Sequence, residues 1–352
     1  MKHHLNYSKE DPNYILLSKI FKIIDSKKSR TIMASKGVKQ INIMILSIKI
    51  IFTAIFFNIT VEFVVSELKR DKKLRKFFKI NDVPSAVQVS EFLARFKPDT
   101  YIKMVNSILM QTKPLKRREK RTFVVDATPV DLDYNIHRKH RSKEYLEKKD
   151  LKWSYSSSYG FYIGFKATVV IEHTSAMPVA ILIHSGAPHD SKIFNEIMEN
   201  LRKRRIIRKR DTILFDRGYY KYENYQIGIS KYKIIPLIFP KENFKIQKLD
   251  DKLTYPLQVF KDKKTEKRSK KLYNTLKKVL IQKIENWKQY KPIRGKIEDF
   301  FKLCKSGLGL KKLHKYTPES AQRTTILTVF LAGLITTTGY NTKTALQKLS
   351  ET

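Results

Sequence analysis

Residues 212–220 have the sequence TILFDRGYY, a short run of β-branched and aromatic residues that ends in an aspartate and a glycine. Such a run predicts a buried strand that carries Asp216 to its C-terminal end. The same design occurs upstream, where residues 122–125 (TFVV) lead into Asp126 and residues 127–129 (ATP) are expected to end the strand. Buried aspartate is rarely without a partner or a metal ion. The two strands therefore predict two halves of one acidic site.

The composition of the chain favours a polyanionic partner. Its 352 residues include 72 Lys and Arg against 33 Asp and Glu, which gives a formal net charge of +39. A field of this size attracts DNA or RNA, and A+T-rich coding, which enriches lysine, does not account for the arginine clusters. With 41% hydrophobic and 11% aromatic residues the chain can also bury a core, and its length suits one large domain and a smaller one.

The sequence gives no sign of a secreted or membrane protein. One cysteine, Cys304, cannot form an internal disulfide or a cysteine-rich zinc site. The N-terminal residues lack the apolar stretch of a signal peptide. The apolar stretches 41–66 and 325–338 are interrupted by polar residues or too short to span a bilayer, so we expect buried helices and no membrane partner. We therefore expect a cytoplasmic, nucleoid-associated protein.

The order of the expected elements indicates an α/β fold with an all-helical N-terminal region. Residues 1–115 have the pattern of helices, and 41–57 is apolar almost all round, which is typical of a helix packed on several sides. The pattern then changes to strands, which we expect at 122–125, 160–172, 177–184, 213–216 and 233–239. Helices are expected at 190–205 and 223–230, over most of 245–290, and from there to residue 349.

The expected elements follow one another as three strands, a helix, a strand, a helix and a fifth strand. This is the element order of an RNase H-like fold, a mixed β-sheet flanked by helices. In that fold the first and fourth strands are neighbours, so Asp126 and Asp216 would meet at one end of the sheet. We expect a helical N-terminal region over residues 1–115 and an RNase H-like catalytic domain over 116–310. Residues 311–352 would form a helical extension that packs on the catalytic domain.

A third carboxylate is predicted on a later helix. Arg294, Glu298 and Lys305 are four and then seven residues apart, so they share one helix face. The apolar side of the same helix would consist of Ile297, Phe300, Phe301 and Cys304. A carboxylate between two basic residues suits metal ligation beside bound phosphates. Taken alone, the pattern also fits an ordinary ion pair between residues four apart on a solvated helix.

Together these motifs resemble the DDE transposases of bacterial and archaeal insertion sequences, in the branch with a Tyr-Arg-Glu-Lys signature. The matching pieces within residues 120–335 are, in order, 126–130 (DATPV), 186–191 (GAPHDS), 216–220 (DRGYY) and Arg294-x3-Glu298-x6-Lys305. The resemblance implies that Asp126, Asp216 and Glu298 are the three catalytic and metal-binding acids. It implies DNA contacts by Arg217, Tyr290, Arg294 and Lys305, although Tyr290 stands one residue further from Arg294 than the family pattern has it.

The resemblance also implies the chemistry and the partners. Three carboxylates would hold two Mg²⁺ ions about 3.5–4 Å apart, with Mn²⁺ as a substitute, because these ions prefer carboxylate oxygen. Such a site activates water to cut a phosphodiester and then activates the freed 3′-OH to attack a second DNA. The expected partners are the terminal inverted repeats, recognised by the N-terminal helices, and the target DNA. A homodimer is expected on DNA.

Several alternatives stay open. Asp190 is interpreted as a helix cap, with support of the metal ligands as the alternative, and Asp131 and Asp133 lie close enough to the first motif to compete as acids. Arg217 would contact phosphate or hold a carboxylate, and the basic residues 202–210 form either a solvated face or a phosphate track. The alternative functions are a metal-dependent nuclease without strand transfer and a non-catalytic DNA-binding protein derived from a transposase.

Overall fold

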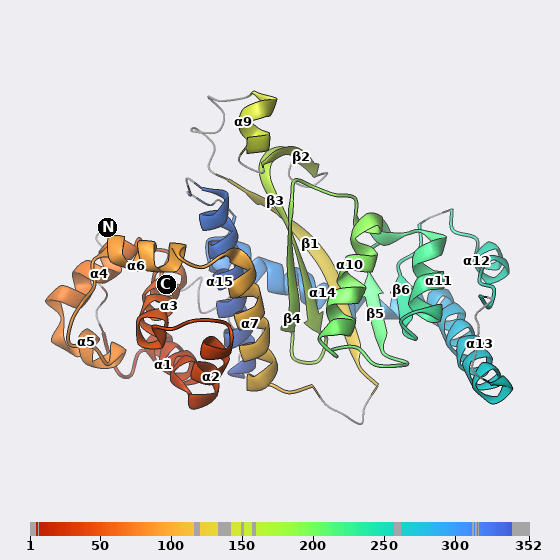
Figure 1. Cartoon of the computed structure of the whole chain (residues 1–352), viewed down its shortest axis with the longest axis horizontal. Coiled ribbons are helices and arrows are strands. Elements are labelled where there is room, and N and C mark those ends of the chain that lie inside the picture. The colour runs from red at the N-terminus through yellow and green to blue at the C-terminus, as the bar shows by residue number, and fades with distance from the viewer. Residues whose placement is uncertain are drawn as a thin grey trace.

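The two strands that lead into aspartate lie side by side in a six-stranded mixed sheet (Figure 1). Strands β1 (Thr122–Asp131) and β5 (Thr212–Phe215) run parallel, with Val125 opposite Phe215. The strand order is β2-β3-β1-β5-β6, and β4 pairs with β3. This arrangement confirms the predicted mixed α/β fold and is consistent with an RNase H-like core.

The remaining strands are β2 (Lys152–Ser156), β3 (Gly160–Glu172), β4 (Met177–Ser185) and β6 (Ile235–Ile238). Two predictions about the sheet were wrong. Strand β2 was missed, because three of its five residues are polar. Strand β1 does not end at 127–129 but continues to Asp131. Beyond Val125 it is paired on one side only, with β3, and a one-sided strand tolerates Pro129.

The computed structural model describes residues 5–339 except 6, 116–119, 133–141, 149–150, 157–159, 242, 257–261, 312, 314 and 316. Asp133, one of the competing acids, and the end of the predicted C-terminal extension therefore lie outside the described residues. The described part of the N-terminal region is helical, as predicted, with α1 (Pro12–Asp25), α2 (Lys27–Ser35), α3 (Ile41–Phe56), α4 (Val61–Arg70), α5 (Lys72–Phe78), α6 (Ala86–Ala94) and α7 (Pro98–Thr112).

Local sequence explains where these helices begin. Ser85 and Gln88 form a reciprocal capping box at the start of α6, and Asp11 caps α1 ahead of a proline in its first turn. Helix α3 is apolar almost all round and largely buried, because α1, α4, α6 and the late helix α15 (Pro318–Thr337) all pack against it. Among the described residues no single helix is long and apolar enough to cross a membrane; α3 and α4 meet these criteria only as a pair bent by 110°.

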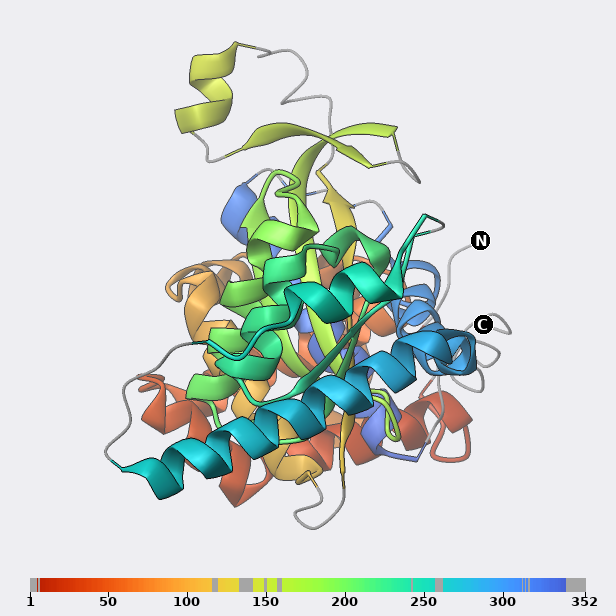
Figure 2. The ribbon, with the colours of Figure 1, turned by 90° about the vertical axis from the view of Figure 1, so that its right-hand side faces the viewer.

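The sheet is covered by helices from both ends of the chain. Helices α7 and α15 pack against each other and against β4, which joins the N-terminal region to the sheet (Figure 1). The other helical elements, from β1 onward, are α9 (Lys143–Lys148), α10 (Asp190–Lys203), the 3₁₀ turn η1 (Arg217–Tyr219), α11 (Tyr222–Ser230), α12 (Ile246–Lys252), α13 (Lys263–Glu285), the 3₁₀ turn η2 (Trp287–Tyr290), α14 (Lys291–Lys302) and the π-helical turn η3 (Leu303–Gly307). Figure 2 shows α13 on the outside of the molecule, in front of β5 and β6.

Candidate active site

Asp126 and Asp216 lie at the same level on neighbouring strands. Because Val125 is opposite Phe215 in the parallel pair, the residues that follow them are adjacent at the end of β5. Asp126 Oδ1 accepts a hydrogen bond of 2.8 Å from the amide of Ala127. Asp216 starts the turn η1, where its carbonyl accepts the amide of Tyr219 at 3.1 Å. The sheet register therefore brings together the two aspartates predicted to share a site.

Glu298 reaches the same end of the sheet from α14. This helix packs on β1 and buries Ile297 and Phe300. An adjacent face of the helix carries Arg294 and Glu298, whose Nη1 and Oε1 atoms are 2.9 Å apart. The predicted division of this helix into an apolar and a charged face is thus present in the structure.

Arg294 connects all three acids. Its Nη2 atom lies 3.6 Å from Asp126 Oδ2 and 3.5 Å from Asp216 Oδ1, while Nη1 bonds to Glu298 Oε1. The two contacts of Nη2 are longer than a charge-assisted hydrogen bond and nearly equal, so this end of the guanidinium is shared between two carboxylates. Three negative groups around one positive group leave a local charge of −2.

Burial of the Asp126 side chain changes its pKa. The Asp126 side chain is 21% exposed, and its burial raises the pKa to about 6, against the opposing effects of the Ala127 amide and the Arg294 guanidinium. Lys305, on the turn η3 after α14, lies close enough to Asp126 to feel its charge, and burial lowers the pKa of this lysine. Lys305 is thus within electrostatic range of Asp126.

Asp190 does not cap α10, which corrects the first interpretation of this residue. The cap is His189, whose side chain accepts the amide of Ser191, and Asp190 is the first helical residue. Asp190 instead forms an ion pair of 2.7 Å with Lys166 Nζ. A Cβ atom at residue 218 would lie 2.7 Å from Asp190 Oδ2, so a side chain at this position would force the acid or the turn η1 to shift, and Gly218 permits their close approach.

The structure adds roles for two residues: Lys166, which the sequence did not single out, and Tyr219, which lies in the 216–220 motif without an assigned role. Lys166 neutralises Asp190 and also donates to the carbonyl of Pro188 at 2.9 Å. Tyr219 is fully buried, and burial together with the nearby charges of Asp190, Asp126 and Asp216 raises its pKa well above the usual value. Lys166 is distant in sequence from the motif acids, so no local pattern could have indicated its role. Tyr219 lies only three residues after Asp216, but the motif did not show that its side chain is buried beside Asp190.

An open cavity of about 480 Å³ lies beside the acids. Asp216 and Glu298 contribute to its wall, together with the cationic side chains of Arg217, Lys291 and Arg294. Its apolar wall is formed by Phe239, Pro240 and Trp287. The combination of cationic and apolar surface next to carboxylates suits a nucleotide with its phosphate. Tyr290, which was also predicted to contact DNA, bonds to a residue outside this cavity wall: its hydroxyl accepts a hydrogen bond of 2.9 Å from Lys283 of α13.

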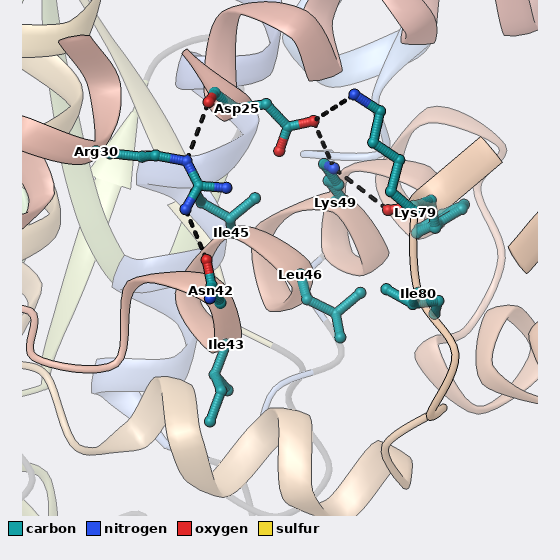
Figure 3. Close-up of a pocket in the computed structure, with 10 residues that line it drawn as sticks. Asp25, Arg30, Asn42, Ile43, Ile45, Leu46, Lys49, Lys79 and Ile80 are labelled. Atoms are coloured by element: carbon teal, nitrogen blue, oxygen red, sulfur yellow. Dashed lines mark hydrogen bonds and ion pairs between the residues drawn. The ribbon is translucent and has the colours of Figure 1, made fainter. Parts of the chain in front are cut away.

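A second cavity, of about 530 Å³, lies in the N-terminal region between α1, α3 and α5 (Figure 3). Its one carboxylate, Asp25, pairs with the buried Lys49 at 2.8 Å, and Lys49 also faces the carbonyl of Phe78 at 3.4 Å. Arg30 donates to the carbonyl of Asp25 and to Asn42 Oδ1 (Figure 3). These polar groups bond to one another and tie helices together, which is a structural role and not a catalytic one.

The acids at the end of the sheet have the right chemistry for divalent metal ions. Carboxylate oxygens are the ligands that Mg²⁺ and Mn²⁺ prefer, and a guanidinium between the three acids marks a position where positive charge is stabilised. As the side chains stand, no group of three or more His, Cys, Asp or Glu within the described part of the chain is arranged to hold a metal ion. Arg294 occupies the space between the carboxylates.

Comparison with known protein families identifies the family of this chain. The family described as the transposase DDE domain matches residues 117–334, which is more than half of the chain and includes Asp126, Asp190, Asp216 and Glu298. No curated protein and no solved structure matches this chain.

Proposed function

The chain belongs to the transposase DDE domain family, and we propose that it cuts DNA at the ends of an insertion sequence and joins the ends to target DNA. The observation that carries the proposal is the convergence of Asp126, Asp216 and Glu298 on one cationic centre, from within β1, from the end of β5 and from α14. A protein that only binds DNA gains nothing from three clustered carboxylates facing a polyanion, because they repel it.

In this proposal Asp126, Asp216 and Glu298 would hold two divalent ions, either Mg²⁺ or Mn²⁺. The bound ions would supply an activated nucleophile and stabilise the leaving oxygen. The remaining roles belong to cationic side chains around the acids. Lys305 and Arg217 would bind the phosphates on either side of the scissile bond, and the 480 Å³ cavity would receive the nucleotide next to it. Lys166 and Tyr219 would keep Asp190 and the turn η1 in place behind the acids.

The other parts of the chain have roles in the same proposal. Residues 1–115 would bind the terminal inverted repeats, residues 116–310 would form the catalytic domain, and residues 311–352 would stabilise it from the C-terminal side. The packing of α15 against α7 and β4 supports a rigid connection between the N-terminal helices and the sheet. Cutting and joining two ends in one reaction requires two copies of the site, so we propose a homodimer assembled on DNA.

The test is the substitution Asp216→Asn. It preserves the shape of the side chain and nearly all of the +39 field but removes one ligand charge. The variant should bind duplex DNA as tightly as the parent without divalent ions and should lose Mg²⁺-dependent nicking, by about a thousandfold or more for a residue acting at the reaction centre. The substrate is a duplex that carries the element ends, recognised as short inverted repeats that flank the coding sequence.

A matched control is Glu223→Gln, which removes one exposed carboxylate outside the site and should cut like the parent. If Asp216→Asn cuts as well as the parent, the catalytic assignment is wrong. If the parent nicks the ends but never joins them to a second duplex, the protein is a nuclease. If the parent binds the ends and does neither, the non-catalytic DNA-binding function is the better one.

A further inference from the structure

Arg294 takes the place of a cation among the three acids. We propose that it is a built-in counter-ion that fills the centre of the site when DNA is absent. A DNA phosphate would then have to draw it away before divalent ions bind with full affinity. This inference rests on the proposed function, since it assumes that Asp126, Asp216 and Glu298 are the metal ligands.

The contacts of Arg294 differ from those of an ordinary ion pair on a helix surface. The bond from Nη1 to Glu298 joins residues four apart, as such pairs do. The other end of the guanidinium, however, leaves the helix and lies between the carboxylates of two strands, 3.6 Å from Asp126 and 3.5 Å from Asp216. One side chain therefore spans the gap between α14 and both strands, which is the gap that ions bound to all three acids would span.

The guanidinium and the divalent ions exclude each other in this position. A positive group within 3.6 Å of carboxylate oxygens uses those oxygens and repels any cation that approaches them. Removal of the guanidinium without replacement would leave three carboxylates facing one another, which is unfavourable. The site is consequently stable in two forms, with Arg294 inside or with divalent ions inside.

The cavity beside the acids offers the Arg294 side chain a second position. Its side chain is 25% exposed and is itself part of the cavity wall, with Lys291 and Arg217 on the same wall. A phosphate there would offer two oxygens in the planar geometry that a guanidinium binds best. Arg294 would exchange carboxylate oxygens for phosphate oxygens, so DNA binding and metal binding would strengthen each other by the same factor. A metal-loaded site would then form mainly on DNA.

The experiment measures Mn²⁺ affinity of the full chain, by the electron paramagnetic resonance signal of free Mn²⁺, with and without a duplex. Without DNA, Arg294→Gln should bind Mn²⁺ about tenfold more tightly than the parent, within the usual range of coupling between sites. Duplex DNA should raise the affinity of the parent toward that of the variant and should change the variant much less. Lys302→Gln removes an exposed cation from the same helix and should behave like the parent.

Two further variants separate the possible failures. If Arg294→Gln binds Mn²⁺ no more tightly than the parent, while adding Asp216→Asn abolishes that binding, the counter-ion inference is overturned and the metal site stands. If Mn²⁺ binding does not depend on Asp216, the proposed function fails instead. Should Arg294→Gln not fold, Arg294→Lys keeps a positive charge that cannot span both strands, and an affinity equal to that of the parent would equally overturn the inference.

Discussion

The two ends of the β1–β5 strand pair carry charged clusters of opposite kinds. Where the strands begin, Arg121 and Asp211 form a pair of 2.6 Å, with side chains only 5% and 4% exposed. At the other end of the strand pair, Asp126, Asp216 and Glu298 share the guanidinium of Arg294, and their side chains are 21%, 34% and 49% exposed. The first cluster is neutral and sealed, whereas the second has an excess of two negative charges and is open to a cavity.

This difference indicates which cluster holds the fold together and which is available to a ligand. Both carboxylate oxygens of Asp211 accept hydrogen bonds: Arg121 donates to each of them, and the amide of Arg208 donates to Oδ2 at 2.8 Å. A buried pair of this kind has no capacity for a further ion. The carboxylates at the other end keep unused oxygens and share too little positive charge, so they gain by binding more.

Breaking the sealed pair should have the largest effect on stability. Arg121→Met leaves Asp211 buried without its cation and should lower the free energy of unfolding by about 3–5 kcal/mol. Urea unfolding measures the loss, and nicking per folded molecule should stay unchanged. The double variant Arg121→Met/Asp211→Leu should recover much of the stability, because no buried charge then remains. A loss below about 1 kcal/mol for Arg121→Met would contradict the structural role of the pair.

The strand pair also shows how much could be predicted from sequence. Runs of β-branched and aromatic residues predicted strands that lead into Asp126 and Asp216, and the element order predicted that the two strands are neighbours, as they are. Asp216 directly follows β5 as predicted, whereas Asp126 lies inside β1. The helical spacing of Arg294 and Glu298 predicted their shared face. These features follow from local periodicity, which the order of residues along a segment determines.

Features that depend on contacts through space were missed. Nothing near Lys166 in the sequence indicates that it pairs with Asp190, and the assignment of Asp190 as a cap failed because the preceding His189 takes that place. The approach of Arg294 to both aspartates depends on how α14 packs on β1, which residue spacing cannot specify. Strand β2 owes its existence to pairing with β3 and not to an apolar pattern of its own.

A third group of charges, on α13, sharpens the comparison because it is almost entirely cationic and exposed. Exposed cations on this helix are Lys263, Lys264, Lys267, Arg268, Lys270, Lys271 and Lys278. The helix has 23 residues, so it is about 34 Å long, and it lies on the outside of the molecule (Figure 2). This length matches about ten base pairs of duplex. Such a surface should bind DNA phosphates without recognising sequence.

Neutralising part of α13 should therefore weaken binding to any duplex. Changing Lys267, Arg268, Lys270 and Lys271 to Gln should reduce the slope of log affinity against log salt by up to about 3.6, which is about 0.9 for each phosphate that the helix no longer neutralises. In the control, each of the same four residues is replaced by the other basic residue, Lys by Arg and Arg by Lys. This keeps the charge and should leave the slope of log affinity against log salt unchanged. An unaltered slope in the Gln variant would mean that α13 is only a solvated surface.

The most direct comparison is one substitution made at each end of the strand pair, and the change at the acidic end should have the smallest effect. Asp211→Asn should destabilise the protein, because it removes the charge that Arg121 and the Arg208 amide stabilise. Asp126→Asn should do the opposite when divalent ions are chelated, because burial raises the pKa of Asp126 from 3.8 to about 6. A raised pKa means that the folded protein holds this proton more tightly than the unfolded chain does. The parent therefore loses stability as the pH rises from about 4 to about 6 and carries the full cost above that range.

Asp126→Asn has no proton to lose, so its advantage over the parent should be near zero at pH 4, grow through pH 6 and stay constant at pH 8. A shift of about two pKa units sets an upper limit of about 3 kcal/mol. Since the side chain is 21% exposed, we expect about 1 kcal/mol, measured by urea unfolding in a chelator. Divalent ions should stabilise the parent and not the variant, so that in their presence the parent becomes the more stable of the two proteins. A variant less stable than the parent at pH 8 in the chelator would show that the acids at this end of the strands are held as firmly as the pair at the other.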